Sequence, residues 1–393
     1  MQYAIKKNLR NLLATLTITA ISAIVSLVIL EIFLRIFHPL PLSPLEMHVF
    51  RLKSSEYYQK DAELRWRPRK SIYGRHDKAG SFSTTFRTNS EGFRDKEYEL
   101  EKPKEICRII AIGDSFTWGY GVNDHEIYTE RLEEMLPKTE VINLGVTAYS
   151  LQQEILYFKR EGLKYAPDIV ILGFCLNDIY QPHHGDLEKR ATIVTPINRQ
   201  IVLPVQSITS KSRVINFKQY LYRKSTLFRF VMERINSNKA LVKTLVSLGI
   251  KGSLKGFEAL DINLMPALRD YPESLEKSWK ETRLALLQLK QLTTDLGIRL
   301  IIVVIPSVQT IQHKSFEHAI VYSIFDQEDF DLDKPYRLLG NFSEKQSIEF
   351  VNPVNLFQKR THEGSSLYLK RDMHFNAVGH DLLAQAIAEH ILN

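Results

Sequence analysis

The stretch ICRIIAIGDS (106–115) decides the fold of this chain. Its run of branched apolar residues ends in Gly113, which predicts a buried parallel strand that runs into a turn. Four further strands are expected at about 140–144, 168–173 (DIVILG), 298–306 (IRLIIVVIP) and 347–354 (SIEFVNPV). Helical patterns are found at about 127–136, 150–161, 275–296 and 376–391. This alternation predicts an α/β fold, in which helices cover both faces of a parallel sheet.

Residues capable of chemistry stand where these elements meet one edge of the predicted sheet. A G-D-S block ends in Ser115, at the junction of the first strand and its helix, and an N-L-G block ends in Gly145. A third block contains Asn177, and a D-M-H-F-N block ahead of the last helix contains Asp372 and His374. Because the carboxyl ends of parallel strands share an edge, the sequence predicts that the blocks meet there.

The residue types in these blocks suit acyl transfer. Serine alone is a poor nucleophile and needs an adjacent base, which a carboxylate in turn orients. The charge that develops on an attacked carbonyl oxygen needs preorganised donors, each typically worth about 10²- to 10³-fold in rate. A glycine lets the backbone approach a substrate closely, and an asparagine side chain supplies a neutral donor.

The ordered blocks resemble the SGNH (GDSL-like) hydrolase family over about residues 88–393. The resemblance implies a flavodoxin-like three-layer α/β/α sandwich. It implies that Ser115 is the nucleophile, that His374 is its general base and later acid, and that Asp372 orients the imidazole. The N–H groups of Ser115 and Gly145 and the side-chain amide of Asn177 would form the oxyanion hole. No metal or other cofactor is implied.

Two local features refine this resemblance. The commonest family pattern places the acid three residues before the histidine, whereas here residue 371 is arginine and the acid is Asp372, two residues before His374. The shorter spacing is similar to that of the alginate-acetylation branch of the superfamily. The segment NSEGFR (89–94) resembles a stretch that often precedes the catalytic core in membrane-anchored members.

Several neighbouring residues are expected to have structural roles. We interpret Asp114 as a hydrogen-bonding turn residue, Asn376 as the N-cap of the last helix, and His380 as a structural histidine. The two cysteines, Cys107 and Cys175, would lie at opposite ends of neighbouring parallel strands, so both are predicted to be free and buried.

The N-terminal sequence predicts a membrane anchor. The stretch NLLATLTITAISAIVSLVIL (11–30) holds twenty residues without a charge, enough for a helix about 30 Å long. A cleaved signal peptide would have a shorter apolar run, and a buried core helix would show a polar stripe. The sequence therefore favours an uncleaved anchor over 11–34.

Basic residues in the tail 1–10 give the anchor its expected orientation. They keep the N-terminus cytoplasmic by the positive-inside rule, so the catalytic domain would be extracytoplasmic. The predicted tail contains three such residues, Lys6, Lys7 and Arg10.

The remainder divides into a linker at 35–60 and a catalytic domain at 61–393, interrupted by an insertion at about 181–271. The insertion is interpreted either as a wall of the substrate pocket or as an excursion without a role in the site. Residues 51–78 carry nine Lys and Arg against four acidic residues. This basic stretch fits anionic lipid, an acidic glycan or a solvated surface equally well.

Composition excludes several classes. The charge of +7 comes from 52 basic and 45 acidic residues, which is too mild for a dedicated nucleic-acid binder. With two cysteines and no Cys/His cluster, the chain encodes neither a disulfide framework nor a structural zinc site.

The leading hypothesis is a membrane-anchored serine esterase or deacylase that acts through an acyl-enzyme on O-acyl, chiefly O-acetyl, esters of a cell-surface glycan. One alternative is an O-acyltransferase that uses the same residues to modify an extracellular polysaccharide. Another is a non-catalytic glycan-binding or assembly protein, and lipid esters are a further substrate class.

Overall fold

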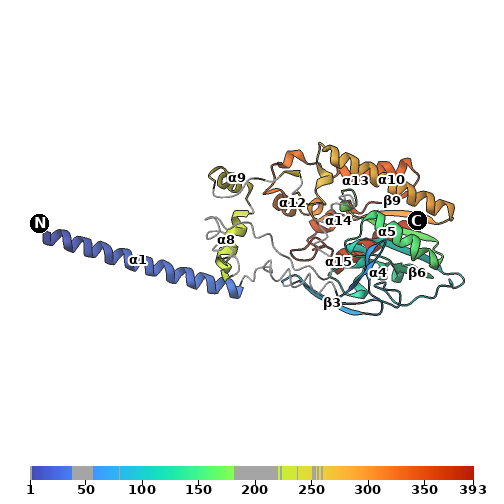
Figure 1. Ribbon diagram of the computed structural model, residues 1–393, viewed down its shortest axis with the longest axis horizontal. Coiled ribbons are helices and arrows are strands. Elements are labelled where there is room, and N and C mark those ends of the chain that lie inside the picture. The colour runs from blue at the N-terminus through green and yellow to red at the C-terminus, as the bar shows by residue number, and fades with distance from the viewer. Residues whose placement is uncertain are drawn as a thin grey trace.

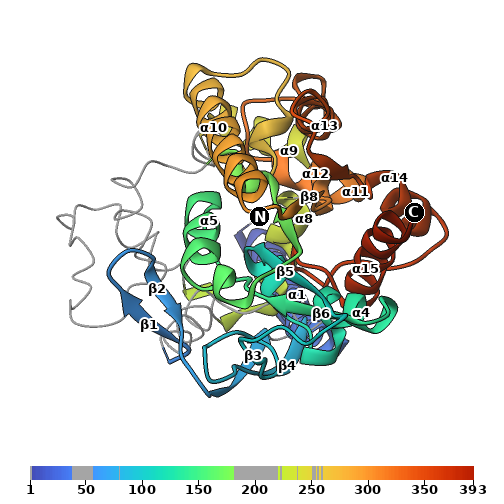
Figure 2. The same ribbon diagram turned by 90° about the vertical axis from the view of Figure 1, so that its right-hand side faces the viewer.

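The computed structural model describes residues 2–37, 56–78, 80–180, 220–221, 224–236, 238–249, 254, 256–257 and 260–393. Its centre is a parallel sheet in the order β6-β5-β7-β8-β9, and Figure 2 shows helices on both faces. The order corresponds to strands 2-1-3-4-5 of a doubly wound flavodoxin-like sheet, so the predicted fold is confirmed. The sheet strands are β5 (Cys107–Gly113), β6 (Thr139–Asn143), β7 (Ile169–Phe174), β8 (Arg299–Val304) and β9 (Glu349–Val351).

Two pairs of helices cover the sheet. One face carries α5 (Leu151–Arg160) and α10 (Glu273–Asp295), which contact each other, and the other face carries α4 (Tyr128–Met135) and α15 (Ala377–Leu392) (Figure 2). The other helices of the domain are α3 (Ser115–Trp118), α11 (Val308–Ile311), α12 (His313–Ile320), α13 (Lys334–Lys345) and α14 (Val354–His362). Short 3₁₀ turns occur at Asp124–Glu126, Gly162–Tyr165, Leu176–Asp178, Met265–Ala267 and Gln327–Asp329.

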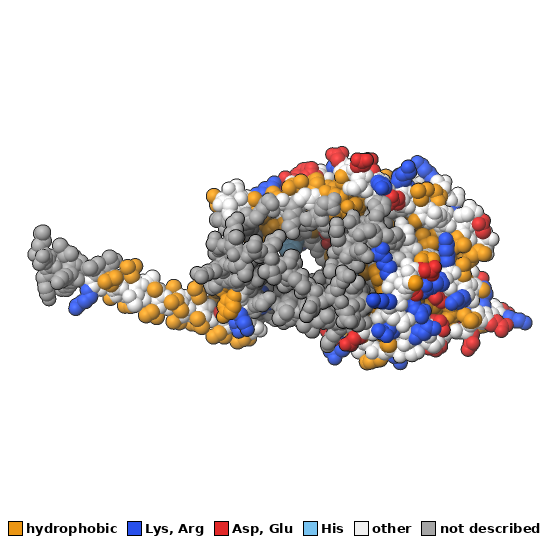
Figure 3. All heavy atoms as spheres, viewed as in Figure 1, with side chains coloured by type: hydrophobic (Ala, Val, Ile, Leu, Met, Phe, Trp, Pro, Cys, Tyr) orange, Lys and Arg blue, Asp and Glu red, His pale blue; other side chains and the backbone are white. Residues whose placement is uncertain are grey.

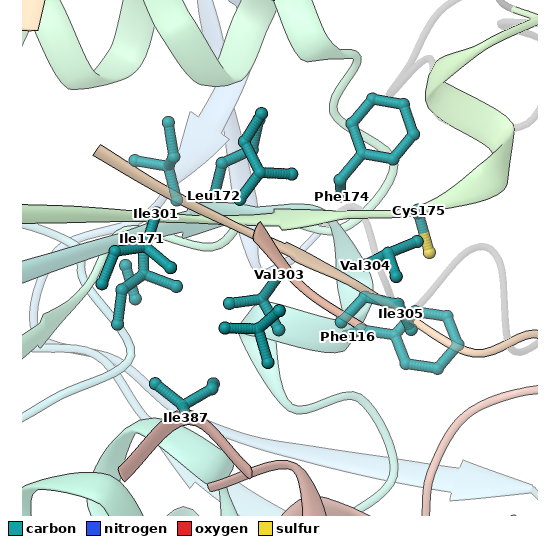
Figure 4. Close-up of a cluster of buried hydrophobic side chains, with 14 of the residues drawn as sticks. Phe116, Ile171, Leu172, Phe174, Cys175, Ile301, Val303, Val304, Ile305 and Ile387 are labelled. Atoms are coloured by element: carbon teal, nitrogen blue, oxygen red, sulfur yellow. The ribbon is translucent and has the colours of Figure 1, made fainter. Parts of the chain in front are cut away.

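The core is formed by apolar side chains on both sides of the central strands. Along β7, Leu172 and Phe174 point to one face and Ile171 to the other, where Ile387 of α15 lies below the sheet (Figure 4). All four are fully buried. The near-continuous apolar runs read from the sequence thus correspond to strands buried on both faces.

Two antiparallel hairpins precede the sheet, in a region where the sequence predicted no elements. They consist of β1 (Tyr58–Asp61) with β2 (Arg65–Pro68), and β3 (Tyr73–Lys78) with β4 (Phe82–Arg87). These strands are short and rich in charged residues, so they lack the apolar pattern that reveals a buried strand. The part of the basic stretch from residue 56 onward folds into these hairpins.

The N-terminal helix α1 (Gln2–Phe37) extends away from the domain (Figure 1). Its segment Leu13–Phe37 is long and apolar enough to cross a membrane, although a signal sequence would meet the same criterion. Near its end lie α8 (Thr226–Asn236) and α9 (Lys239–Ser247), which belong to the predicted insertion.

The insertion is described only in part, because residues 181–219 lie outside the described ranges. Its last portion packs against the domain: Leu264 and Met265 join Phe316 and Ile320 of α12 in a small apolar cluster. This portion therefore belongs to the folded domain. The predicted boundaries of tail, linker and domain stay predictions.

The structural expectations for single residues hold with one correction. Asn376 caps α15 by accepting the Gly379 N–H, and both cysteines are free, with Cys175 buried. Cys107 is half-buried rather than buried, because it opens β5 at the rim of the sheet.

Candidate active site

The Ser115 hydroxyl is presented by a tight turn between β5 and α3. Asp114 is the N-cap of α3, and its Oδ1 accepts the N–H of Phe116 at 2.9 Å. A Cβ atom at Gly113 would lie 2.2 Å from Thr117 Oγ1, so this turn requires glycine. As the first residue of the helix, Ser115 has an N–H without an acceptor inside α3. The turn therefore presents both a hydroxyl and an amide at the carboxyl edge of the sheet.

The structure brings Ser115, His374 and Asp372 together in hydrogen-bonding order. Ser115 Oγ lies 2.7 Å from His374 Nε2, and His374 Nδ1 lies 2.6 Å from Asp372 Oδ1. The same carboxylate oxygen accepts the His374 N–H at 3.0 Å. An ionised carboxylate only accepts hydrogen bonds, so Nδ1 carries the imidazole proton and Nε2 is left to accept from the serine. The two-residue spacing is thus compatible with triad geometry.

A lysine from the N-terminal hairpins completes this group. Lys78 Nζ, at the end of β3, lies 2.5 Å from Asp372 Oδ2 and donates to the Arg371 carbonyl at 3.0 Å. Burial raises the pKa of Asp372, but the hydrogen bonds from His374 and Lys78 outweigh it and hold that pKa below its ordinary value. Sequence reasoning missed Lys78, since it lies 294 residues from Asp372 in an apparently solvated basic stretch.

Two of the predicted oxyanion donors, Asn177 and Gly145, already donate hydrogen bonds to neighbouring side chains. The Asn177 amide donates from Nδ2 to Asp114 Oδ2 at 3.1 Å, which leaves its second amide hydrogen for another acceptor. The Gly145 N–H already donates to Asn143 Oδ1 at 2.9 Å. A Cβ at Gly145 would lie 2.3 Å from the Trp118 N atom, so glycine is needed for packing against α3.

Acidic side chains gather beneath the nucleophile turn. Burial raises the pKa values of Asp114, Asp178 and Glu154, and their mutual repulsion adds to the effect at Asp178 and Glu154. Neither carboxylate oxygen of Glu154 has a hydrogen-bond partner among the described residues. Burial also raises the pKa of the Cys175 thiol, so the thiol stays protonated. Because burial disfavours charge, these shifts favour the protonated forms of the three acids.

The NSEGFR segment holds the loop that follows α3. Asn89 Oδ1 accepts the N–H groups of Glu91 and Phe93, which forms a turn. The fully buried Arg94 donates to the carbonyls of Gly119 and Val122 at 2.5 and 2.7 Å. These bonds fix the chain immediately after the nucleophile helix, so the segment supports the site from outside it.

A small recess of about 10 Å³ borders the site. Its lining includes Phe116, which follows the serine, and Met373, which precedes the histidine. Cys175 contributes from the end of β7 and Gln309 from α11, and Asn263 comes from the insertion. The insertion therefore supplies part of the wall of this recess.

No group of three or more His, Cys, Asp or Glu side chains with metal-binding geometry occurs in the described parts of the chain. The chemistry available at this site consists of a hydroxyl, an imidazole paired with a carboxylate, and hydrogen-bond donors. These groups, at the carboxyl edge of a parallel sheet, are of the kinds that serine hydrolases use.

Comparison with known proteins agrees with this class. Residues 111–246 match the model of the GDSL-like Lipase/Acylhydrolase family, so the predicted resemblance is confirmed over this part of the chain. The matched range contains Ser115, Gly145 and Asn177, whereas Asp372 and His374 lie beyond it. The family supports an ester hydrolase. No curated protein sequence matches the chain.

Solved structures with partial similarity include a member of the lipolytic G-D-S-L family from Veillonella parvula, with 13% identity and a TM-score of 0.39, covering 73% of this chain and 99% of that one. A catalytic mutant of an acetylxylan esterase from Geobacillus stearothermophilus shows 12% identity and a TM-score of 0.39, over 74% and 96% of the two chains. The acetyl xylan esterase AlAXEase shows 12% identity and a TM-score of 0.37, and the match covers 72% of this chain and 99% of that one.

Proposed function

We propose that the protein is a membrane-anchored serine esterase that removes O-acyl groups, chiefly O-acetyl, from a cell-surface glycan through an acyl-enzyme. The observation that carries this proposal is the continuous pair of contacts from Ser115 Oγ to His374 Nε2 at 2.7 Å and from His374 Nδ1 to Asp372 Oδ1 at 2.6 Å. A nucleophile, a base and an orienting carboxylate in this order are what ester hydrolysis through a serine requires.

In the acylation step, Ser115 Oγ attacks the ester carbonyl carbon while its proton passes to His374 Nε2. The Asp372 carboxylate stabilises the imidazolium that forms, without itself taking the proton. His374 then gives the proton to the departing sugar oxygen, and the acyl group remains on Ser115. Water attacks the acyl-enzyme by the reverse sequence, which releases the carboxylic acid and restores the serine.

The negative charge on the carbonyl oxygen would be held by the Ser115 N–H and the second amide hydrogen of Asn177. The bond from Asn177 to Asp114 supports this role, because it fixes the amide next to the nucleophile turn. For the Gly145 N–H to contribute as well, it must share its hydrogen between the oxyanion and Asn143 Oδ1. Ser115 and Asn177 are therefore the principal donors in this proposal.

A short acyl group is favoured by the small size of the bordering recess. Its volume of about 10 Å³ is far below the roughly 300 to 1,000 Å³ typical of pockets for drug-sized ligands. The buried Phe116 and Cys175 supply apolar surface that suits a methyl group. The glycan substrate is proposed because the apolar helix α1, as an anchor, would hold the domain at a membrane surface with its N-terminus in the cytoplasm and its catalytic domain outside.

The test is hydrolysis of p-nitrophenyl acetate by the full chain in detergent. Ser115→Ala and His374→Ala should each lower kcat by up to about 10⁶-fold, and Asn177→Ala by about 10²- to 10³-fold. His362→Ala, at an exposed position on α14, serves as the matched histidine control and should retain full activity.

A second arm of the experiment adds oligosaccharide acceptors and follows the acetyl group. Acetate released into water supports the esterase, whereas acetyl recovered on the sugar would move the assignment to an O-acyltransferase that uses the same residues. Equal background rates for wild type and variants in both arms would overturn the catalytic proposal in favour of a glycan-binding protein.

A further inference from the structure

The helices α8 and α9 form a basic, amphipathic hairpin. Residues 220–249 contain six Lys and Arg and a single acidic residue, Glu233. Apolar side chains are exposed on both helices and on the turn that follows: Val231 is 45% exposed, Leu241 41% and Leu248 65%. Helices that combine exposed apolar residues with basic ones commonly lie in the interface of a membrane. We call the described residues 224–249 the α8–α9 hairpin.

The hairpin is attached to the end of α1 by an unusual cap. The Glu31 carboxylate accepts the N–H groups of Thr226 and Leu227 at 2.7 and 2.8 Å and the Ser225 hydroxyl at 2.8 Å. A carboxylate in this position satisfies free N–H groups and complements the positive end of the α8 dipole. The first turn of α8 is therefore fixed at the residue where the uncharged stretch of α1 ends.

Two neighbours on α1 reinforce this contact. Arg35 pairs with Glu31 at 2.8 Å and donates to the Lys224 carbonyl at 2.6 Å. Leu34 is only 5% exposed, whereas the other large apolar side chains recorded on α1 are exposed. In Figure 3, hydrophobic side chains follow α1 up to the region where it meets the hairpin. Leu34 therefore lies where α1 contacts the rest of the protein, whereas the apolar side chains before it are exposed.

The hairpin also joins α1 to the catalytic domain. Lys243 pairs with Asp326 at 2.9 Å, and Lys239 pairs with the same carboxylate at 3.0 Å and donates to the Phe325 carbonyl. The hydrogen bonds from Lys243 and Lys239 lower the pKa of Asp326, so the carboxylate stays ionised. These contacts hold the hairpin between α1 and the domain.

We propose that the α8–α9 hairpin lies on the bilayer surface and binds anionic lipid headgroups. The inference rests on the membrane anchoring in the proposed function and is independent of its catalytic assignment. Figure 1 shows α8 crossing the end of α1 at a steep angle, so an α1 that spans the bilayer places α8 near the membrane plane. Its depth is that of Glu31, where the uncharged segment meets the headgroups. Apart from the two lysines that pair with Asp326, residues 224–249 carry three basic residues, Lys224, Arg229 and Arg234, against one acidic residue, and this excess favours anionic lipid.

This placement turns the active-site edge of the sheet toward the membrane. The helix α12 follows the carboxyl end of β8 and lies on the side of the domain that faces the hairpin (Figure 1). The candidate active site lies at the same edge of the sheet, since Ser115 directly follows β5. Esters presented close to the bilayer surface are therefore favoured over those far from it.

The experiment measures the depth of a fluorescent label in the reconstituted full chain. An environment-sensitive fluorophore on Leu241→Cys is compared in phosphatidylcholine vesicles with and without phosphatidylglycerol, using lipids that carry a quencher near the headgroup. We expect a blue shift and quenching that increase with phosphatidylglycerol and weaken with salt. Leu248→Cys gives a second reading if the first variant does not fold. The matched control is Leu296→Cys, at an exposed leucine ahead of β8, where no quenching is expected.

Flotation of the same vesicles separates the two proposals. Protein that floats but shows no quenching at Leu241→Cys or Leu248→Cys would overturn the hairpin inference and leave the anchor intact. Protein that does not float at all would overturn the anchor and the inference together. Because neither readout needs turnover, an inactive enzyme has no bearing on the result.

Discussion

Two groups of carboxylates flank Ser115, and their environments differ sharply. Asp372 faces the imidazole of His374 and the ammonium of Lys78, and its pKa lies below the ordinary value. On the other side, burial and the repulsion of neighbouring acids raise the pKa values of Asp178 and Glu154. Burial acts in the same direction in both places, but at Asp372 the hydrogen bonds from His374 and Lys78 outweigh it, whereas at Asp178 and Glu154 the neighbouring acids add to it.

The proposed mechanism would use this difference. A negative Asp372 would support the imidazolium that forms during acylation, whereas acids whose raised pKa values favour the protonated form would keep further negative charge away from an oxyanion that carries the same sign. Substitutions that remove each environment in turn should differ in the size of their effect.

Neutralising the charged acid should cause the largest loss. Asp372→Asn keeps the shape of the side chain but removes the charge that stabilises the imidazolium and fixes its tautomer, so kcat should fall by about 10⁴-fold. The measurement is p-nitrophenyl acetate hydrolysis, with thermal unfolding as the test of folding. Activity close to wild type in a folded variant would mean that Asp372 is not part of the triad.

Removing the cation beside that acid should have an intermediate effect. Lys78→Met loses a hydrogen bond between charged groups, typically worth about 1.5 to 3 kcal/mol, so kcat should fall by roughly 10- to 100-fold. Lys78 acts as a positioning residue, because it reaches the serine only through Asp372 and His374. Lys70→Met is the matched control, since Lys70 pairs with Glu91 where both side chains are about 40% exposed.

Rescue by a conservative variant distinguishes positioning from general support of the fold. Lys78→Arg keeps a cation beside Asp372, so it should recover part of the activity that Lys78→Met loses. Equal losses of kcat in folded Lys78→Arg and Lys78→Met would show that the charge of Lys78 does not act on Asp372.

Neutralising the buried acid should have the smallest effect, and it concerns stability. Glu154 has a folded pKa well above its ordinary value of 4.5, so wild type loses stability as pH rises from about 4.5 toward the folded pKa. Glu154→Gln lacks this titration and should gain stability relative to wild type as pH rises, by up to about 1.4 kcal/mol for each pH unit between the unfolded and the folded pKa of Glu154.

Urea unfolding at pH 5 and pH 8 measures this difference. Glu161→Gln serves as the control on the end of the same helix, because Glu161 pairs with Arg160 and Lys164 and should show no gain. A Glu154→Gln variant whose relative stability does not change with pH would contradict a protonated cluster.

The sequence alone determined the sheet, the order of the site blocks and several local caps. Apolar runs such as 106–113 and 168–174 report burial directly, and residues such as Asn376 act on a backbone N–H only three residues away. Interactions of this kind depend on neighbours along the chain, so a pattern of residues is enough to predict them. The apolar helix α1 belongs to the same category, because length and hydropathy define it.

Only the tertiary structure decided which distant groups meet at the site. Lys78 reaches Asp372 across 294 residues, and Glu31 reaches Thr226 across 195. It also decided that the N–H of Gly145 bonds to Asn143, although the glycine itself was correctly singled out. A charged or polar residue has the same local pattern whether it faces water or a buried partner. Its role is therefore fixed by the packing of separate elements, which brings together groups that the sequence leaves far apart.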